Sequence, residues 1–355
     1  MAYRVIQWAT GGIGRAAIEA IVSHPELELV GAWVHSEKKA GMDVGDIVGC
    51  GPLGVTATGD VDELLALEAD CVMYAPVMAN KEELIRILES GKNVVTPLNW
   101  FYRGDRNWDA LEAACQKGGV TLHGTGINPG GVTERFPLMV SALTREVTFV
   151  RAEEWSDIRS YGAPQVVGEV MQFGKTPEDA QKSIMAKMMG DGFLQSIDMV
   201  ADEIGFDLDP EKRTTHEGSV SSEPVDSPIG VIEPGLVTAQ RFTWEGLVRG
   251  ESVIQVTTNW FMGHGPFESG WSFGEGGERF EVEVKGDPSS LVTFHGWHPE
   301  TVEAGLERNP GIVATAVHGV SAISATCRAG TGVKNYLDLP LVAGRAAPAL
   351  ARETS

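Results

Sequence analysis

The clearest chemical signal in this sequence is a glycine-rich turn near its N-terminus, Trp-Ala-Thr-Gly-Gly-Ile-Gly over residues 8–14. It follows an apolar run and opens a helical one, which is the context of a dinucleotide-binding turn. Gly11 lets the backbone approach a diphosphate, Gly14 lets the helix lie close to the strand, and the helix N-terminus offers unpaired N–H groups. Ala9 replaces the first glycine of the Gly-x-Gly-x-x-Gly template, and alanine is tolerable at this position if its φ is negative. A tight turn without a ligand is the alternative. The residues that we expect to contact a dinucleotide here are Ala9, Thr10, Gly11, Gly12, Ile13 and Gly14.

The end of the next predicted strand bears on which nicotinamide cofactor the turn would hold. It reads His35-Ser36, followed by Glu37, Lys38 and Lys39. A site for NAD usually has an acidic residue at this strand end to bind the ribose 2′-hydroxyl. A hydroxyl and two cations suit a 2′-phosphate better, so we predict NADP(H), with Ser36 and Lys38 as contacts. NAD(H) stays open, as does a plain solvated loop.

The composition excludes several classes of partner. The chain has 355 residues and a formal net charge of −21, and a field of that sign repels nucleic acid and anionic membrane surfaces. It has no apolar run of about 18 residues and no basic-then-apolar leader at its N-terminus. Four cysteines, Cys50, Cys71, Cys115 and Cys327, are widely spaced without a Cys-x-x-Cys pair. We therefore expect no metal, no membrane span, reduced thiols and a cytoplasmic location.

The elements that must position the turn alternate along the first half of the chain. Predicted strands cover residues 5–8, 27–34, 70–76, 93–98 and 120–126, and predicted helices cover 16–22, 81–92 and 107–119. Short, continuously apolar strands separated by helices indicate a parallel sheet covered on both faces. Such sheets bind ligands at the carboxyl ends of their strands.

The pattern changes near Glu146. Longer strand-like segments follow at 146–158, 237–248, 251–263, 278–286 and 291–297, with helices predicted over 176–189 and 192–205. Asn309 and Pro310 open a last helix, whose apolar face we expect to pack on the first domain. The predicted architecture is α/β with an added α+β region: a dinucleotide-binding domain over 1–145, an α+β domain over 146–308, and a returning helix and tail over 309–345.

The segment His-Gly-Thr-Gly-Ile-Asn-Pro-Gly-Gly at 123–131, with the turn at 8–14, resembles the dihydrodipicolinate reductase-like oxidoreductases. Within them the chain is most similar to the 2,4-diaminopentanoate dehydrogenase and native amine dehydrogenase branch. The likeness extends through 177–184, 192–209, 231–237, 311–320 and 336–340. It implies an N-terminal Rossmann domain with a doubly wound parallel sheet, and a C-terminal α+β domain for substrate contacts and homodimerisation. It also implies NAD(P)H-dependent reduction of imines formed from ketones and ammonia, or the reverse deamination.

The resemblance also implies positions for the cofactor. It places Ala75, Pro76 and Val77 beside the ribose, Thr96 near the nicotinamide, and Asn128 with its following glycines on the nicotinamide and substrate side.

One departure from the family concerns catalysis. Members carry a glutamate after the strand at 93–96, where it handles the proton of the amine or water, and here that place holds Asn99 and Trp100. Asparagine does not take up a proton at neutral pH and can only orient a group. We retain Asn99 as a catalytic-site residue and Tyr102 as a candidate proton donor, the alternative being an aromatic packed beside Trp100 and Phe101.

Three residues of the second domain are candidate substrate contacts: Glu154, Trp155 and His264. Surface charge for the carboxylate, and core or structural roles for the other two, are the alternatives. Because neighbouring strand residues point to opposite faces, Glu154 and Trp155 cannot face the same cleft.

The sequence leaves three functions open. The first is an oxidoreductase that interconverts amines and carbonyls. The second is a carbonyl or ene reductase that incorporates no ammonia, favoured by Asn99. The third is a non-catalytic dinucleotide-binding sensor.

Overall fold

The computed structural model describes residues 2–351. Contacts divide the chain into two compact units, Met1–Gly126 with Ile312–Ser355 and Ile127–Gly311. The first unit ends at Gly126, before the expected boundary at 145. The reason lies in packing, because Val132 is already part of the apolar core that Val150 and Phe280 belong to in the second unit.

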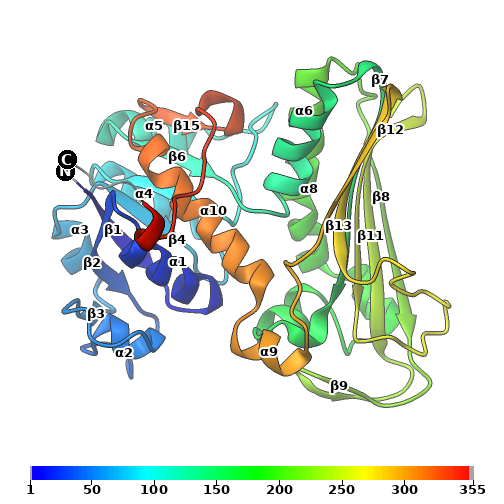
Figure 1. Ribbon diagram of the computed structural model, residues 1–355, viewed down its shortest axis with the longest axis horizontal. Coiled ribbons are helices and arrows are strands. Elements are labelled where there is room, and N and C mark those ends of the chain that lie inside the picture. The colour runs from blue at the N-terminus through cyan, green and yellow to red at the C-terminus, as the bar shows by residue number, and fades with distance from the viewer. Residues whose placement is uncertain (1, 352–355) are drawn as a thin grey trace. The chain divides into compact units, whose positions relative to one another are not determined.

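The first unit is built on a seven-stranded sheet with the order β15-β6-β5-β4-β1-β2-β3 (Figure 1). All of its strand pairs are parallel, as the alternating pattern predicted. The strands are β1 Tyr3–Trp8, β2 Leu27–Trp33, β3 Ala57–Thr58, β4 Cys71–Tyr74, β5 Asn93–Thr96, β6 Thr121–Gly124 and β15 Gly332–Lys334.

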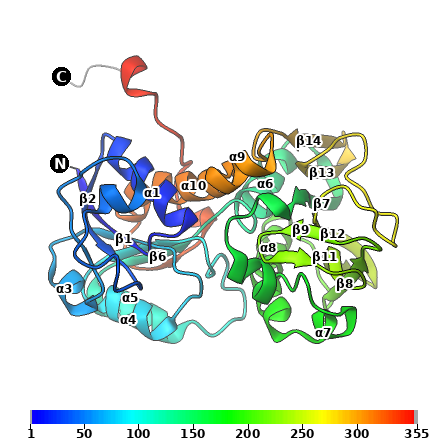
Figure 2. The ribbon, with the colours of Figure 1, turned by 90° about the horizontal axis from the view of Figure 1, so that it is seen from below.

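Helices cover both faces of this sheet (Figure 2). The helices that flank it are α1 Gly12–Ser23, α2 Val44–Val48, α3 Val61–Ala66, α4 Lys81–Glu89, α5 Asp109–Gly118 and α10 Pro310–Thr326. One buried cluster joins α1 and α10 to the sheet through Ile18, Val320 and Val5. A second cluster joins α4 and α5 to its other face. The returning helix α10 therefore completes the core of the first unit, with Asn309 accepting the Gly311 N–H at its start (2.9 Å).

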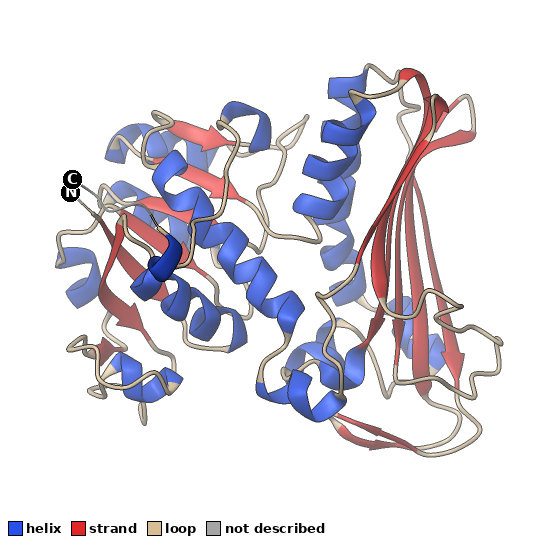
Figure 3. Cartoon of the chain, viewed as in Figure 1, coloured by secondary structure: helices blue, strands red, loops and turns tan. Residues whose placement is uncertain are grey.

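The second unit contains a six-stranded mixed sheet with the order β14-β13-β7-β12-β11-β8 (Figure 3). Its strands are β7 Arg145–Asp157, β8 Arg213–Val220, β11 Val237–Val248, β12 Glu251–Phe261, β13 Arg279–Asp287 and β14 Ser290–Phe294. A separate ribbon pairs β9 Val225–Ser227 with β10 Gly230–Ile232. The helices are a π-helix at Gly131–Arg135, α6 Phe136–Ser141, a π-helix at Val166–Val170, α7 Pro177–Lys182, α8 Ile184–Ile204 and α9 Val302–Glu307.

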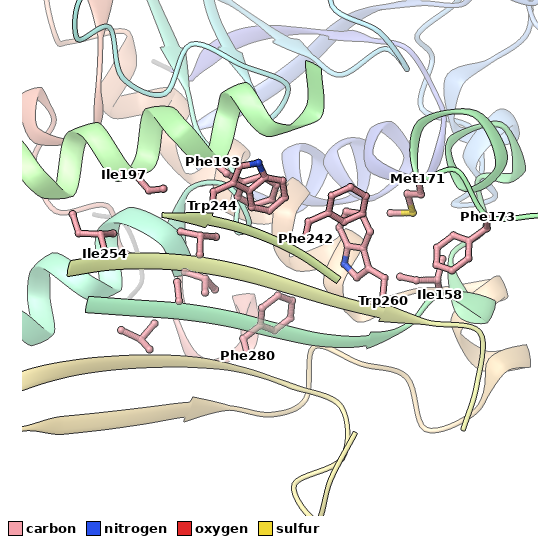
Figure 4. Close-up of a cluster of buried hydrophobic side chains, with 14 of the residues drawn as sticks. Ile158, Met171, Phe173, Phe193, Ile197, Phe242, Trp244, Ile254, Trp260 and Phe280 are labelled. Carbon is pink, nitrogen blue, oxygen red and sulfur yellow. The ribbon is translucent and has the colours of Figure 1, made fainter. Parts of the chain in front are cut away.

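One face of this second sheet is buried by helix α8. Phe193 and Ile197 of α8 lie over Trp244, Phe242 and other inward-facing side chains of the strands (Figure 4). The predicted helices over 176–189 and 192–205 are divided differently, because the chain breaks at Ser183 and α8 runs on through Gly190. A Cβ at Gly190 would lie 2.6 Å from the Trp244 indole nitrogen. This glycine therefore permits close packing and does not end the helix.

The other face of the second sheet is polar. Arg151 contacts the carboxylates of Glu153, Glu281 (2.9 Å) and Glu283 (3.0 Å), and all four side chains are at most one-quarter exposed. Alternation along β7 thus separates two environments, an apolar one beneath α8 and a charged one opposite. Among residues 2–351, no helix has the length and apolarity to cross a bilayer, and no three His, Cys, Asp or Glu side chains gather as a metal site.

Candidate active site

The first unit has a topological switch point between β1 and β4. From β1 the chain proceeds to β2 and β3 on one side, and later to β4, β5 and β6 on the other. Loops leaving the two strands diverge at such a point, which is where open parallel sheets bind ligands. The segments that leave β1 and β4 here are the glycine turn and the run Ala75–Val77. Backbone bonds fix both, since Ala9 N–H donates to Trp33 (3.0 Å) and Ala75 N–H to Trp8 (3.1 Å).

Ala9 adopts a left-handed conformation with φ of 75°, so the condition under which alanine is tolerated without strain, a negative φ, is not met. The cause is the close approach of helix α1, because a Cβ on Gly14 would lie 2.1 Å from the Ala9 carbonyl oxygen. That carbonyl also accepts a hydrogen bond from the Gln7 side chain (3.0 Å). An L-residue in this region costs roughly 1–2 kcal/mol, which the surrounding contacts must offset.

Gly11, at the N-cap of α1, faces open space. Its φ is −75°, and a Cβ built on it would meet nothing within 4 Å. The helix behind it is 12 residues long, so its unpaired N–H groups present partial positive charge to this space. A diphosphate fits a site of this kind. Gly11 therefore matters because it has no side chain to fill this space. Its φ is one that any residue can adopt.

The loop after β2 is tied to the glycine turn by a lysine. Lys39 Nζ donates to Thr10 Oγ1 (3.2 Å), and its backbone N–H donates to the Ser36 carbonyl (2.9 Å). The Ser36, Glu37 and Lys38 residues are exposed. The roles of Ser36 and Lys38 as cofactor contacts stay predictions, and Lys39 is the lysine of this loop that is bonded to the turn. The sequence shows that both lysines lie in one basic loop, but only the fold shows that Lys39 is the one bonded to the turn.

Two further strand ends lie along the same edge of the sheet. Tyr74 donates to Glu83 of α4 (2.6 Å) and accepts from the Asn80 N–H (3.1 Å), which holds both ends of the loop containing Ala75, Pro76 and Val77. Ala75 is buried and Val77 is exposed. At the end of β5, Thr96 is fully buried and accepts the Leu98 N–H (3.3 Å).

Asn99 and Trp100 occupy a constrained turn beyond β5. Trp100 has φ of 64°, and its N–H donates to the Asn99 side chain (2.7 Å). A Cβ at Gly124, the end of β6, would lie 2.2 Å from the Asn99 carbonyl. Strained, non-glycine residues thus follow both β1 and β5, and such strain is concentrated at ligand sites. Tyr102 is partly buried beside the buried Phe101.

The second unit carries a carboxylate in a hydrogen-bonded setting. Glu154 of β7 faces the α8 side of the sheet and accepts a bond from the Asn128 side-chain N–H. Ser156 Oγ donates to its other oxygen (2.6 Å) and contacts His298 Nε2 (2.9 Å). Burial raises the pKa of Glu154 above its ordinary value, against the effect of the donors around it. Burial also lowers the pKa of His298 to about 4, so this ring is neutral at pH 7.

The structure joins Asn128 to Glu154 but separates the other two predicted substrate contacts from them. Trp155 lies on the polar face of the sheet, with the Arg279 guanidinium 3.7 Å from its ring centroid. His264 is exposed and contacts Phe273, which packs with Phe261 on that same face. Roles for Trp155 and His264 in substrate binding stay predictions.

A parallel sheet with an open glycine turn at its switch point is the arrangement that nicotinamide-dependent oxidoreductases use to bind their cofactor. Residues 5–96 match the N-terminal domain of dihydrodipicolinate reductase, and residues 132–352 match the C-terminal domain of 2,4-diaminopentanoate dehydrogenase. The chain belongs to the amine dehydrogenase family of NAD(P)-dependent oxidoreductases, as its sequence resemblance indicated.

Individual relatives agree with this assignment. An amine dehydrogenase of Streptomyces virginiae is 30% identical over 95% of this chain and 96% of its own length. The 2,4-diaminopentanoate dehydrogenase of Acetoanaerobium sticklandii is 24% identical over 73% of this chain and 68% of its own length. The structure of an amine dehydrogenase from Mycobacterium smegmatis has the same fold, with a TM-score of 0.76 and 21% identity, covering 97% of this chain and 98% of that one.

Proposed function

We propose that this enzyme uses NADP(H) to interconvert a small ketone and ammonia with the corresponding primary amine. The open space in front of Gly11, at the N-terminus of α1, is the observation that carries the cofactor half of the proposal. Family membership supports the reaction type, since two relatives that match 95% and 73% of this chain are named amine dehydrogenase and 2,4-diaminopentanoate dehydrogenase.

The residues of the first unit divide between the parts of the cofactor. The turn Ala9–Gly14 would hold the diphosphate, and Ser36, Lys38 and Lys39 the 2′-phosphate. Ala75–Val77 would lie along the ribose, with Thr96 and Asn128 beside the nicotinamide. When bound, the cofactor supplies or takes up a hydride. The chain's part is to hold the acceptor carbon near that ring and to manage the protons.

The test is a product assay. Purified enzyme with NADPH and a panel of small ketones is incubated with and without ammonium, and the products are identified by mass spectrometry. We expect amine only when ammonium is present, and faster turnover with NADPH than with NADH. If NADPH quenches protein fluorescence, and so binds, but no product forms from any ketone, the proposed reaction is contradicted.

Reduction without ammonia is the second candidate, and Asn99 favours it. This side chain stands where the family has a carboxylate, and it cannot exchange a proton at neutral pH. Alcohol or saturated product formed equally well without ammonium would identify this activity.

We also propose that the enzyme works as a homodimer in the cytoplasm. Family membership supports the first point, and we assign the contact to the polar face of the second sheet, where Arg151 lies opposite α8. The free thiols of Cys50, Cys71, Cys115 and Cys327 support a reducing compartment. Light scattering of wild type and Arg151→Glu tests the dimer, with monomers expected for the variant.

A further inference from the structure

The surroundings of Glu154 contain polar oxygens that the fold leaves unused. Thr258 pairs with Glu154 in the neighbouring strand β12, points to the same face and is fully buried. Within the part of the chain that the structure describes, neither the Thr258 hydroxyl nor the side-chain oxygen of Asn128 has a hydrogen-bond partner. Buried polar groups without partners are costly, so such atoms indicate a ligand or water.

The chemistry of these atoms specifies the ligand. The Asn128 N–H is directed to Glu154, which leaves the amide oxygen as an acceptor. Ser156 directs its single proton to Glu154, so the neutral His298 must donate from Nε2 to the Ser156 oxygen. The site therefore offers acceptors: a carboxylate, an amide oxygen and a hydroxyl. A group with several N–H donors and a positive charge satisfies all three.

Apolar side chains enclose this polar group. Phe280 pairs with Glu154 from β13, and the His298 ring stacks on it at 5.2 Å. The indole N–H of Trp260 lies near enough to favour the ionised carboxylate, yet it forms no hydrogen bond with a described residue. Burial, and then the nearby charge of Glu154, raise the pKa of Tyr161. An organic cation with a small alkyl group matches this combination of walls and acceptors.

Two other carboxyl groups lie near Glu154. Glu278 accepts the Asp157 N–H (2.5 Å), and burial, with repulsion from Asp157 and Glu154 added, raises the pKa of Glu278 to about 7. Arg159 neutralises Asp157 (2.6 Å). A further carboxylate, from a substrate, is therefore disfavoured beside Glu154.

We propose that Glu154, the Asn128 side-chain oxygen and the Thr258 hydroxyl bind the protonated nitrogen of the substrate, and that Glu154 is the catalytic residue that exchanges its proton. The proton-exchange half rests on the proposed function.

In the amination direction, Glu154 takes a proton from ammonium. The freed nitrogen lone pair forms the C–N bond to the ketone carbon, and the carbonyl π pair moves to oxygen. One proton passes from nitrogen to that oxygen. Glu154 then returns its proton to the hydroxyl, the C–O bond breaks and water leaves. The resulting iminium carbon accepts the hydride of the proposed function, which gives the amine.

The test compares Glu154→Gln with Glu153→Gln, which makes the same change one residue away on the opposite face. Binding of isopropylammonium chloride is measured by calorimetry, and oxidation of propan-2-amine is measured as a function of pH. We expect Glu154→Gln to raise the isopropylammonium Kd by at least about 10-fold and to lower kcat by about 100-fold or more. It should also abolish the rise of rate with pH and leave the Kd for NADPH unchanged. Glu153→Gln should leave all four quantities near wild type.

A second variant distinguishes a loss of substrate binding from a folding defect. Thr258→Val preserves shape and removes only the hydroxyl, and we expect about a 10-fold weaker isopropylammonium affinity at unchanged thermal stability.

Equal behaviour of Glu154→Gln and Glu153→Gln would overturn the proposal. So would a Glu154→Gln variant impaired only on diamines, since the carboxylate would then bind a distant amino group. A different outcome separates the two proposals: wild type binds isopropylammonium through Glu154 but turns over no ketone or amine. That result would support the nitrogen site and overturn the proposed function.

Discussion

The ammonium group of Lys39 lies 3.2 Å from the Thr10 hydroxyl, which links the loop after β2 to the glycine turn after β1. Ser36 and Lys38 are exposed on the same loop, and under the proposed function Lys39 is the side chain that we assign to the 2′-phosphate. Cofactor choice is therefore the property most directly tied to this contact.

We predict that Lys39→Ala weakens NADPH binding by about 10-fold or more while changing NADH binding little, because a charge-assisted bond to phosphate is lost. Fluorescence titration with both nucleotides measures the ratio. Lys39→Arg keeps the charge and should recover most of the NADPH affinity. An equal loss of affinity for NADPH and NADH would mean that Lys39 positions the turn and does not contact the 2′-phosphate.

The strain at Ala9 gives a prediction on stability. Ala9→Gly should raise the free energy of unfolding by about 1 kcal/mol, because glycine adopts φ near 75° without the cost that an L-residue bears. Urea denaturation measures the change. Ala20→Gly, the same substitution inside α1, should lower stability by about 0.5–1 kcal/mol. Two losses of similar size would show that Ala9 is not strained.

Gly11 and Gly14 should respond differently to the same added methyl group. Gly14→Ala places a Cβ 2.1 Å from the Ala9 carbonyl, so it should destabilise the first unit and lower Tm. Gly11→Ala meets nothing in the protein, so it should fold with an unchanged Tm and yet bind NADPH at least about 10-fold more weakly. Calorimetry and nucleotide titration separate the effects. Full NADPH affinity in Gly11→Ala would place the diphosphate elsewhere.

The buried Glu134 predicts a pH dependence of stability. It is 2% exposed, Ser196 donates to it (2.7 Å), and burial raises its pKa to about 8. The folded state then holds a proton that the unfolded state releases above about pH 4.3. The free energy of unfolding should fall as pH rises from about 4.3 towards 8, by up to about 1.4 kcal/mol per pH unit from this group.

Glu134→Gln should remove that decline, so its stability relative to wild type should increase between pH 5 and pH 8. Denaturation at both values measures it. The exposed Glu68→Gln is the control and should follow wild type. A constant difference between Glu134→Gln and wild type across this range would show that Glu134 is ionised in the folded protein.

The sequence alone determined most of the elements of the first unit, but not the short β3, β15, α2 and α3. Alternating apolar strands and helices predicted a parallel sheet, and the spacing of Gly11 and Gly14 predicted a dinucleotide turn, because these signals are local. Local signals also gave Asn309 as the start of α10 and the alternation that separates Glu154 from Trp155.

Tertiary structure decided what depends on close approach between distant segments. Gly14 against the Ala9 carbonyl fixed a left-handed alanine, and Gly190 against Trp244 continued a helix that local glycine preference would end. The neighbours of Glu154, namely Asn128 from one loop and Thr258 from the next strand, follow from sheet register. Register is set by burying a whole face, so no single segment contains it.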